Sequence, residues 1–105
     1  MSKISMYAVR DMKVEVFTNP MFLRNDAEAQ RVLIATMIKG DSDIANFPHD
    51  FALFKLGEFD QETGKVSQDA TPTLLMSGTA AKSMAVEQVA RFAENSKKEN
   101  KEKVA

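Results

Sequence analysis

The sequence predicts an α+β domain, with a mostly antiparallel sheet of about four strands, one crossing helix and a C-terminal helix. Three observations predict it. Short apolar stretches form two hairpin-like pairs, within residues 4–17 and 51–68. One strongly periodic helix lies between them, at residues 26–39. Residues 80–95 contain no glycine or proline and carry a weak apolar stripe, which indicates a second helix.

The first pair of strands is expected at residues 4–9 and 13–17. Residues 13–17 alternate polar and apolar side chains, as a half-buried strand does. Pro20 ends the pair because proline has no N–H for a strand ladder.

The helix at residues 26–39 has signals at both ends. Asn25 is a good N-cap, and Glu28 follows three residues later, as in a capping box. Gly40 is expected to end the helix in the left-handed conformation. The face expected to pack on the sheet carries Ala29, Val32, Leu33, Ile34, Thr36, Met37 and Ile38.

The second pair follows a single helical turn at residues 44–47. Residues 51–59 form the strongest predicted strand, because apolar side chains occupy both of its faces. A turn containing Gly64, placed for a positive φ, returns the chain as a strand over 65–68.

The C-terminal third is expected to be less regular. Pro72 and Gly78 indicate a surface loop over 70–79. We expect a single domain at residues 1–79, a helix at 80–95, and a charged tail at 96–105 that is a fraying helix or disordered.

Composition excludes several classes of protein. The 105-residue chain is 44% hydrophobic and 28% charged, as is ordinary for one globular domain. It has no cysteine and one histidine, which excludes disulfides, thiolate zinc sites and histidine-rich metal sites. No apolar run or N-terminal h-region indicates a membrane helix or a signal peptide, so we expect a cytoplasmic protein with no membrane partner. The formal net charge of −1 argues against a strongly basic DNA coat.

Residues with catalytic or metal-binding chemistry are few. His49 stands beside Asp50, but no nucleophile is evident near this pair. Asp41, Asp43 and Asp50 lack the further ligands of a calcium loop, and helix capping explains them more simply. The glycines stand singly and form no phosphate-binding loop. We expect no enzyme, no metal site and no cofactor.

Aromatic and basic residues interleave on the predicted strands. Exposed aromatic rings on a sheet, flanked by cations, bind single-stranded DNA by stacking and phosphate contact. The alternative is that the aromatic rings are core and the cations are ordinary solvated side chains. One helix leaves a sheet face and the strand edges uncovered, which predicts a homo-oligomer. The candidate nucleic-acid-binding residues are Tyr7, Arg10, Lys13, Arg24, Phe54 and Lys55.

Several segments together resemble the small nonstructural protein of gokushoviruses, the tailless single-stranded-DNA phages of the Microviridae. The segments are Met6–Asp11, Asn19–Phe22, Asn25–Arg31, Pro48–Phe54 and Leu56–Gly64. The last of them, Leu-Gly-Glu-Phe-Asp-Gln-Glu-Thr-Gly, is the most specific, and Phe51 stands where that family usually has tyrosine. The resemblance covers about residues 5–68. It implies a role in viral single-stranded DNA synthesis or genome packaging, in the cytoplasm of the infected bacterium and outside the mature virion.

Two functions remain open at this point. The first is an oligomeric single-stranded-DNA-binding protein, in which several weak sites raise affinity by avidity without a basic net charge. The second is an adaptor that binds viral replication or capsid proteins and never contacts DNA. The acidic balance, the seven methionines and the C-terminal helix favour the adaptor.

Overall fold

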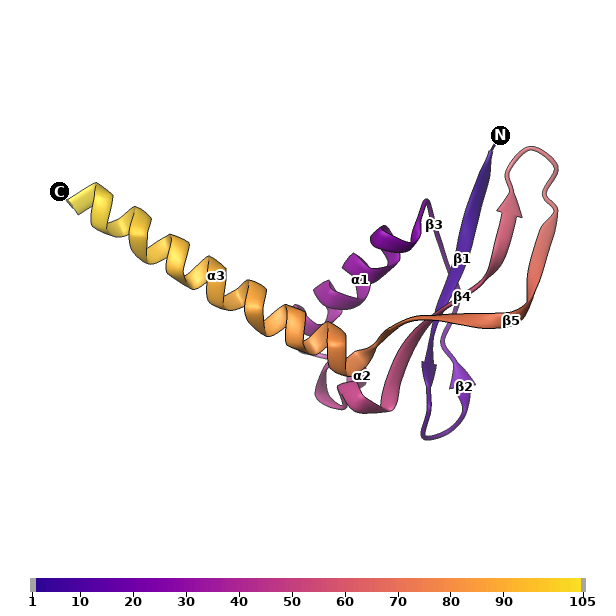
Figure 1. Cartoon of the computed structure of the whole chain (residues 1–105), viewed down its shortest axis with the longest axis horizontal. Helices are drawn as coiled ribbons and strands as arrows, with labels where there is room; N and C mark the ends of the chain where they lie inside the picture. Colours follow the sequence, from indigo (N-terminus) through magenta and orange to yellow (C-terminus); the bar gives the residue numbers. More distant parts are fainter. Residues whose placement is uncertain (1, 105) are drawn as a thin grey trace.

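The computed structural model describes residues 2–104, with side chains from 2 to 96. Within these residues an antiparallel sheet of five strands has the order β2-β1-β4-β5, and the short β3 also pairs with β1 (Figure 1). The helices gather on one side of the sheet, and this arrangement confirms the predicted α+β class. The elements are β1 (Lys3–Asp11), β2 (Val16–Phe17), β3 (Met21–Leu23), α1 (Asp26–Lys39), α2 (Asp43–Asn46), the 3₁₀ turn η1 (Pro48–Asp50), β4 (Phe51–Asp60), β5 (Val66–Ser77) and α3 (Gly78–Val104).

Asn25 and Gly40 cap α1 as predicted, but the Glu28 carboxylate accepts from Arg24 and so leaves the predicted capping box half formed. The Asn25 side chain accepts a hydrogen bond from the Glu28 backbone N–H at 2.9 Å. At the other end Gly40 adopts φ 73°, and its N–H donates to the Thr36 carbonyl. These contacts satisfy terminal groups that have no partner inside the helix.

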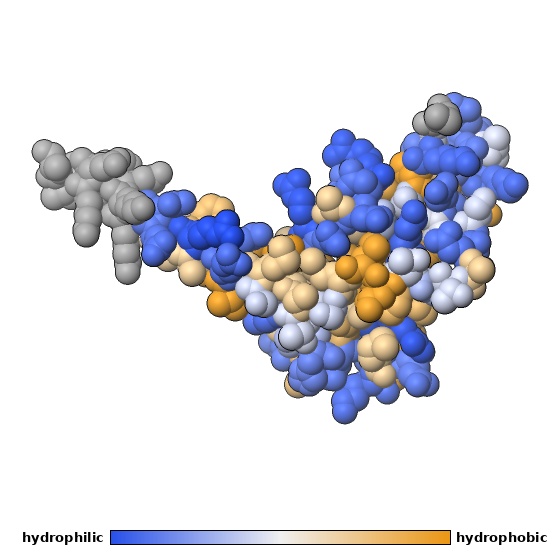
Figure 2. Space-filling model, viewed as in Figure 1, coloured by the Kyte–Doolittle hydropathy of each residue, from blue (hydrophilic) through white to orange (hydrophobic). Residues whose placement is uncertain are grey.

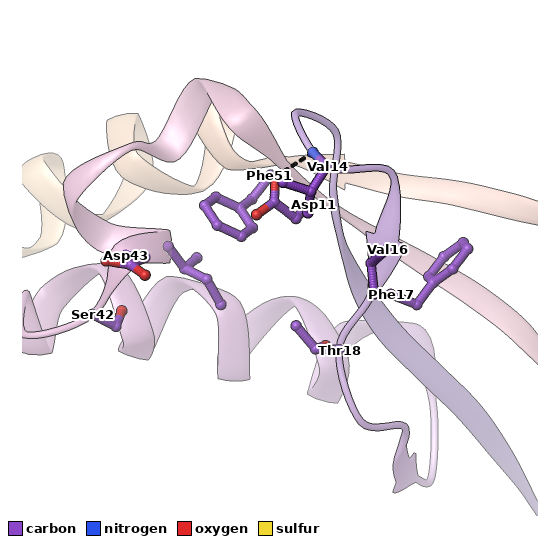
Figure 3. Close-up of a pocket in the computed structure, with 9 residues that line it drawn as sticks. Asp11, Val14, Val16, Phe17, Thr18, Ser42, Asp43 and Phe51 are labelled. Carbon is purple, nitrogen blue, oxygen red and sulfur yellow. Dashed lines mark hydrogen bonds between the residues drawn. The ribbon is translucent and has the colours of Figure 1, made fainter.

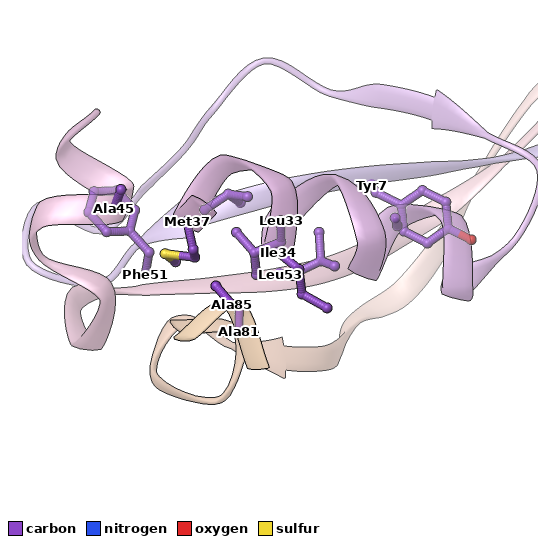
Figure 4. Close-up of a cluster of buried hydrophobic side chains, with 11 residues drawn as sticks. Tyr7, Leu33, Ile34, Met37, Ala45, Phe51, Leu53, Ala81 and Ala85 are labelled. Carbon is purple, nitrogen blue, oxygen red and sulfur yellow. The ribbon is translucent and has the colours of Figure 1, made fainter. Parts of the chain in front are cut away.

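The core lies between α1, the start of α3 and one face of the sheet (Figure 4). Tyr7, Leu33 and Leu53 are its largest fully buried side chains. Burying one such apolar side chain contributes about 1.5–3 kcal/mol. Ala81 and Ala85 of α3 are also buried here, so the first turns of the C-terminal helix belong to the same core.

Two short strands near the N-terminus differ from the prediction. The strand at residues 13–17 shrinks to Val16–Phe17. The carboxylate of Asp11 accepts hydrogen bonds from the N–H groups of Lys13 and Val14, and this turn replaces the ladder. The short strand β3 had no sequence signal, because three residues are too few to show alternation.

The loop predicted at 70–79 is wrong, since β5 continues to Ser77. Leu53 pairs with Met76 and Phe54 with Leu74, which extends the ladder. Pro72 lies in the irregular part of the edge strand, between the paired residues Gln68 and Thr73, where a missing N–H costs least.

Helix α3 begins before the predicted residue 80 and continues past 95. Of the predicted tail, Ala105 and the side chains after Ser96 lie outside the described residues. Within the described chain, no helix has both the length and the apolar character needed to cross a membrane.

Candidate nucleic-acid interface

One face of the sheet points away from the helices, and we call it the open face. Side chains alternate along β1 and β4, so Tyr7, Val9 and Leu53 face α1 while their neighbours face the other way. Strand register then places the facing residues of β5, β2 and β3 beside them. The open face comprises Ile4, Met6, Ala8, Arg10, Phe17, Phe22, Ala52, Phe54, Gly57, Phe59, Val66, Gln68, Leu74 and Ser77.

Four phenylalanine rings on the open face form two edge-to-face pairs. The ring centroids of Phe17 and Phe54 are 5.7 Å apart with an interplanar angle of 76°. Those of Phe22 and Phe59 are also 5.7 Å apart, at 71°. This geometry is the preferred one for aromatic pairs. Phe17 is 37% exposed and Phe22 47% exposed, so each pair presents one ring to solvent.

Arg10 adds a cation to the first pair. Its guanidinium carbon lies 5.5 Å from the centre of the Phe17 ring, within cation–π range. Its Nε is buried, and among the described residues no group accepts a hydrogen bond from it. A buried donor without a partner costs about 1–3 kcal/mol. An external anion does not reach this buried atom, so a phosphate would pair with the charge of the guanidinium group.

The structure brings together two of the six candidate residues. Arg10 and Phe54 both lie on the open face, and Phe17 contacts each of them. Tyr7 does not join them, because its ring is fully buried and faces α1. The Tyr7 hydroxyl donates a hydrogen bond to Asp26 Oδ1 at 2.7 Å. The expectation of an exposed stacking ring at this position is therefore wrong.

The other three candidates lie elsewhere. Lys13 is exposed in the turn between β1 and β2. Arg24 precedes α1 and forms an ion pair with Glu28 at 2.8 Å. Lys55 is half-buried and pairs with Tyr7 in the β1–β4 register, so it belongs to the helix-covered face. Sequence reasoning missed Phe17, Phe22 and Phe59. For Phe17 a signal existed, because alternation along its strand places it on the opposite face from Val16.

Burial raises the pKa of the Tyr7 phenol, and the hydrogen bond to Asp26 raises it further. The fold therefore favours the neutral phenol, whose ordinary pKa is 10.0. This contribution is fully present below that pH and is lost as pH rises through the raised pKa. We expect the stability difference between wild type and Tyr7→Phe to shrink as the pH rises above about 10 in urea unfolding. A constant difference would contradict this.

A separate hollow of about 380 Å³ lies between the β1–β2 hairpin and α2 (Figure 3). Its lining is mostly apolar, with Val14, Val16, Ile44 and Phe51 among the residues. The Asp11 carboxylate at its edge accepts hydrogen bonds from its own turn.

The side chains that the structure describes include no group of three acidic or histidine residues placed to hold a metal ion. His49 Nε2 lies 3.5 Å from Asp50 Oδ1 and is exposed.

A comparison with protein-family models gives a match over most of the chain. A family model described as Phage ORF5 protein matches residues 4–81. This range contains all of α1 and, apart from Lys3, the whole sheet. Neither the curated proteins nor the solved structures include a match.

Proposed function

The chain belongs to the Phage ORF5 protein family, and we propose that it is a nonstructural phage protein that binds single-stranded DNA through the open face. The proposed setting is a gokushovirus of the Microviridae, during viral DNA synthesis or genome packaging in the cytoplasm of the infected bacterium. The proposal includes no catalytic activity and no cofactor.

The cluster of Arg10, Phe17 and Phe54 carries this proposal. DNA bases stack on exposed aromatic rings regardless of sequence, and each stacked base contributes about 1–3 kcal/mol. Phe17 and Phe22 each offer one such ring at the surface. Arg10 supplies a guanidinium charge and N–H donors for a phosphate beside the first ring.

The charge of the open face sets the expected dependence on salt. Arg10 is the one charged residue among those that define this face, and the whole chain has a net charge of −1. Each phosphate contact to a single strand contributes about −0.7 to the slope of log affinity against log salt. We therefore expect log affinity to fall against log salt with a slope of about −1, which is much less steep than the slope of a basic DNA coat.

We expect the Phe17→Leu and Phe54→Leu double variant to lose about tenfold or more of its affinity for an oligo-dT strand of about 30 nucleotides. Leucine keeps the apolar volume but removes the stacking surface. Arg10→Gln should lose a similar amount and flatten the salt slope. Fluorescence anisotropy of the labelled strand at about 50 and about 200 mM salt measures these affinities and the salt slope, and a duplex of the same length serves as the control.

Matched controls lie on other surfaces. Phe47→Leu changes a ring that is 53% exposed but follows α2, and Arg31→Gln changes an exposed cation on α1. Both should bind like wild type. Undetectable binding at low salt, or equal losses in the controls, would reject the proposal.

The adaptor remains the second candidate, and the same face favours it. A surface with exposed Phe22, Val66 and Leu74 and a single charge also fits an apolar protein partner. If a viral replication or capsid protein is the partner, the wild-type chain should capture it, the Phe22→Glu variant should not, and neither chain should bind DNA. Deleting residues 80–105 does not test this cleanly, because Ala81 and Ala85 belong to the core.

A further inference from the structure

Helix α3 leaves the body of the protein after its first turns (Figure 1). Ala81 and Ala85 are buried against the core, but the next apolar side chains have no cover among the described residues. Val86 is 60% exposed, Val89 50% and Phe92 70%. Apolar surface continues from the body onto this part of the helix (Figure 2).

These exposed side chains form one stripe. At 100° per residue, Ala85, Val86, Phe92 and Ala93 all lie within about 60° of Val89 around the helix. Charged residues lie on the opposite side: Glu87, Arg91 and Glu94 are about 140–160° away from Val89. Glu87 and Arg91 form an ion pair there at 2.8 Å. A helix with this pattern has an apolar side that needs a packing partner.

The stripe begins at a groove between the two long helices. Met37 and Ile38 of α1 line it together with Ala85, Val86 and Val89 of α3, its volume is about 210 Å³, and the half-buried Lys82 of α3 lines it as well. Ile38 is 44% exposed at its rim. The groove therefore has room for one large apolar side chain from outside this chain.

We propose that this surface binds a second copy of the chain, with the two α3 helices antiparallel about a two-fold axis at Val89. In this register Phe92 of the second copy lies over Ala85 and reaches Ile38, while Ala93 of the second copy meets Val86. Each large side chain is opposite a small one, which lets the helices approach closely. The two-fold axis repeats both contacts, so one patch is complementary to itself.

Charge and area agree with this occupant. The stripe from Ala85 to Ala93 has no charged member. Lys82, one heptad before Val89, lies beside Ser96 of the second copy in this register, so no like charges meet at the interface, and Glu87, Arg91 and Glu94 stay in water. A stable interface buries about 1,200–2,000 Å² in total. Each copy contributes only a few turns of α3 and part of α1, so we expect an area at the small end of this range and dissociation at about micromolar concentration.

This inference does not depend on DNA binding by the open face. The open face lies on the other side of the sheet from α1, so a dimer through α3 leaves it uncovered in both copies. Two open faces in one particle would give a long single strand two contacts, and avidity would then compensate for the lack of basic charge.

Cysteine cross-linking tests the register, because the chain has no cysteine of its own. Val89→Cys should form a disulfide-linked dimer, since residue 89 meets itself at the axis. Val86→Cys and Ala93→Cys should cross-link when mixed, but neither should do so alone. Cross-linking of each variant alone would indicate parallel helices and overturn the proposed register.

Sedimentation velocity from about 1 to about 100 µM tests the interface itself. Phe92→Glu should be monomeric throughout, with a weakening of at least about tenfold. Met84→Glu is the matched control, because Met84 is 42% exposed on the same helix but about 140° away from Val89. Phe22→Glu on the open face should also dimerise like wild type. A wild-type monomer at every concentration, or a dimer that Phe92→Glu leaves intact, would overturn the proposal.

Discussion

Replacing Tyr7 by alanine is expected to lower the free energy of unfolding by about 3–5 kcal/mol. The ring is fully buried between the sheet and α1, so its removal leaves a cavity in the core. Its hydroxyl also donates to Asp26 in the first turn of α1, so the same change leaves that carboxylate without its donor. Urea unfolding followed by circular dichroism measures the loss.

Tyr7→Phe separates the ring from the hydroxyl. It keeps the packing and removes one hydrogen bond, so we expect a loss of about 1 kcal/mol. This variant should remain folded at 25 °C and bind oligo-dT like wild type, because the hydroxyl faces α1 and not the open face. A folded Tyr7→Phe protein with weakened DNA binding would restore Tyr7 as a binding residue and contradict the site described above.

The comparison of Tyr7 with Phe54 shows what sequence can predict about a site. Both residues stand in strands that are apolar on both faces, so periodicity does not say which face is covered. Only the strand register and the position of α1 assign Tyr7 to the core and Phe54 to the open face. The sequence therefore led to a correct face for Phe54 and to the wrong face for Tyr7.

Sequence signals predicted correctly those features that depend on neighbouring residues, such as the caps of α1. Asn25 and Gly40 each act within one helix turn, and both were predicted in their roles, whereas the Glu28 side chain accepts from Arg24 and does not complete the capping box. The aromatic pairs could not be found this way, because Phe17 and Phe54 come from strands far apart in the chain. The length of β5 was missed for the same reason: Leu74 and Met76 are strand residues only because β4 supplies their ladder.

Gly78→Ala is the second large effect, and it follows from a close approach between backbones. A Cβ at residue 78 would lie 1.9 Å from the Pro48 carbonyl oxygen and 2.8 Å from that of Phe51. Backbone atoms cannot rotate away as a flexible side chain can, so α3 or η1 must move. We expect a loss of about 3 kcal/mol or more, at the upper end of overpacking effects.

Gly64→Ala is the matched control for this glycine. Gly64 has φ 76°, but its Cβ would meet nothing within 4 Å. Its cost is only that of the left-handed backbone, about 1 kcal/mol. Because Gly78 seats the first turn of α3 on η1, Gly78→Ala should also weaken dimerisation through α3, while Gly64→Ala should leave it unchanged. Equal unfolding midpoints for the two variants would show that the backbone at the junction between β5 and α3 shifts at little cost. The position of α3 on the core would then be too variable to hold the proposed interface.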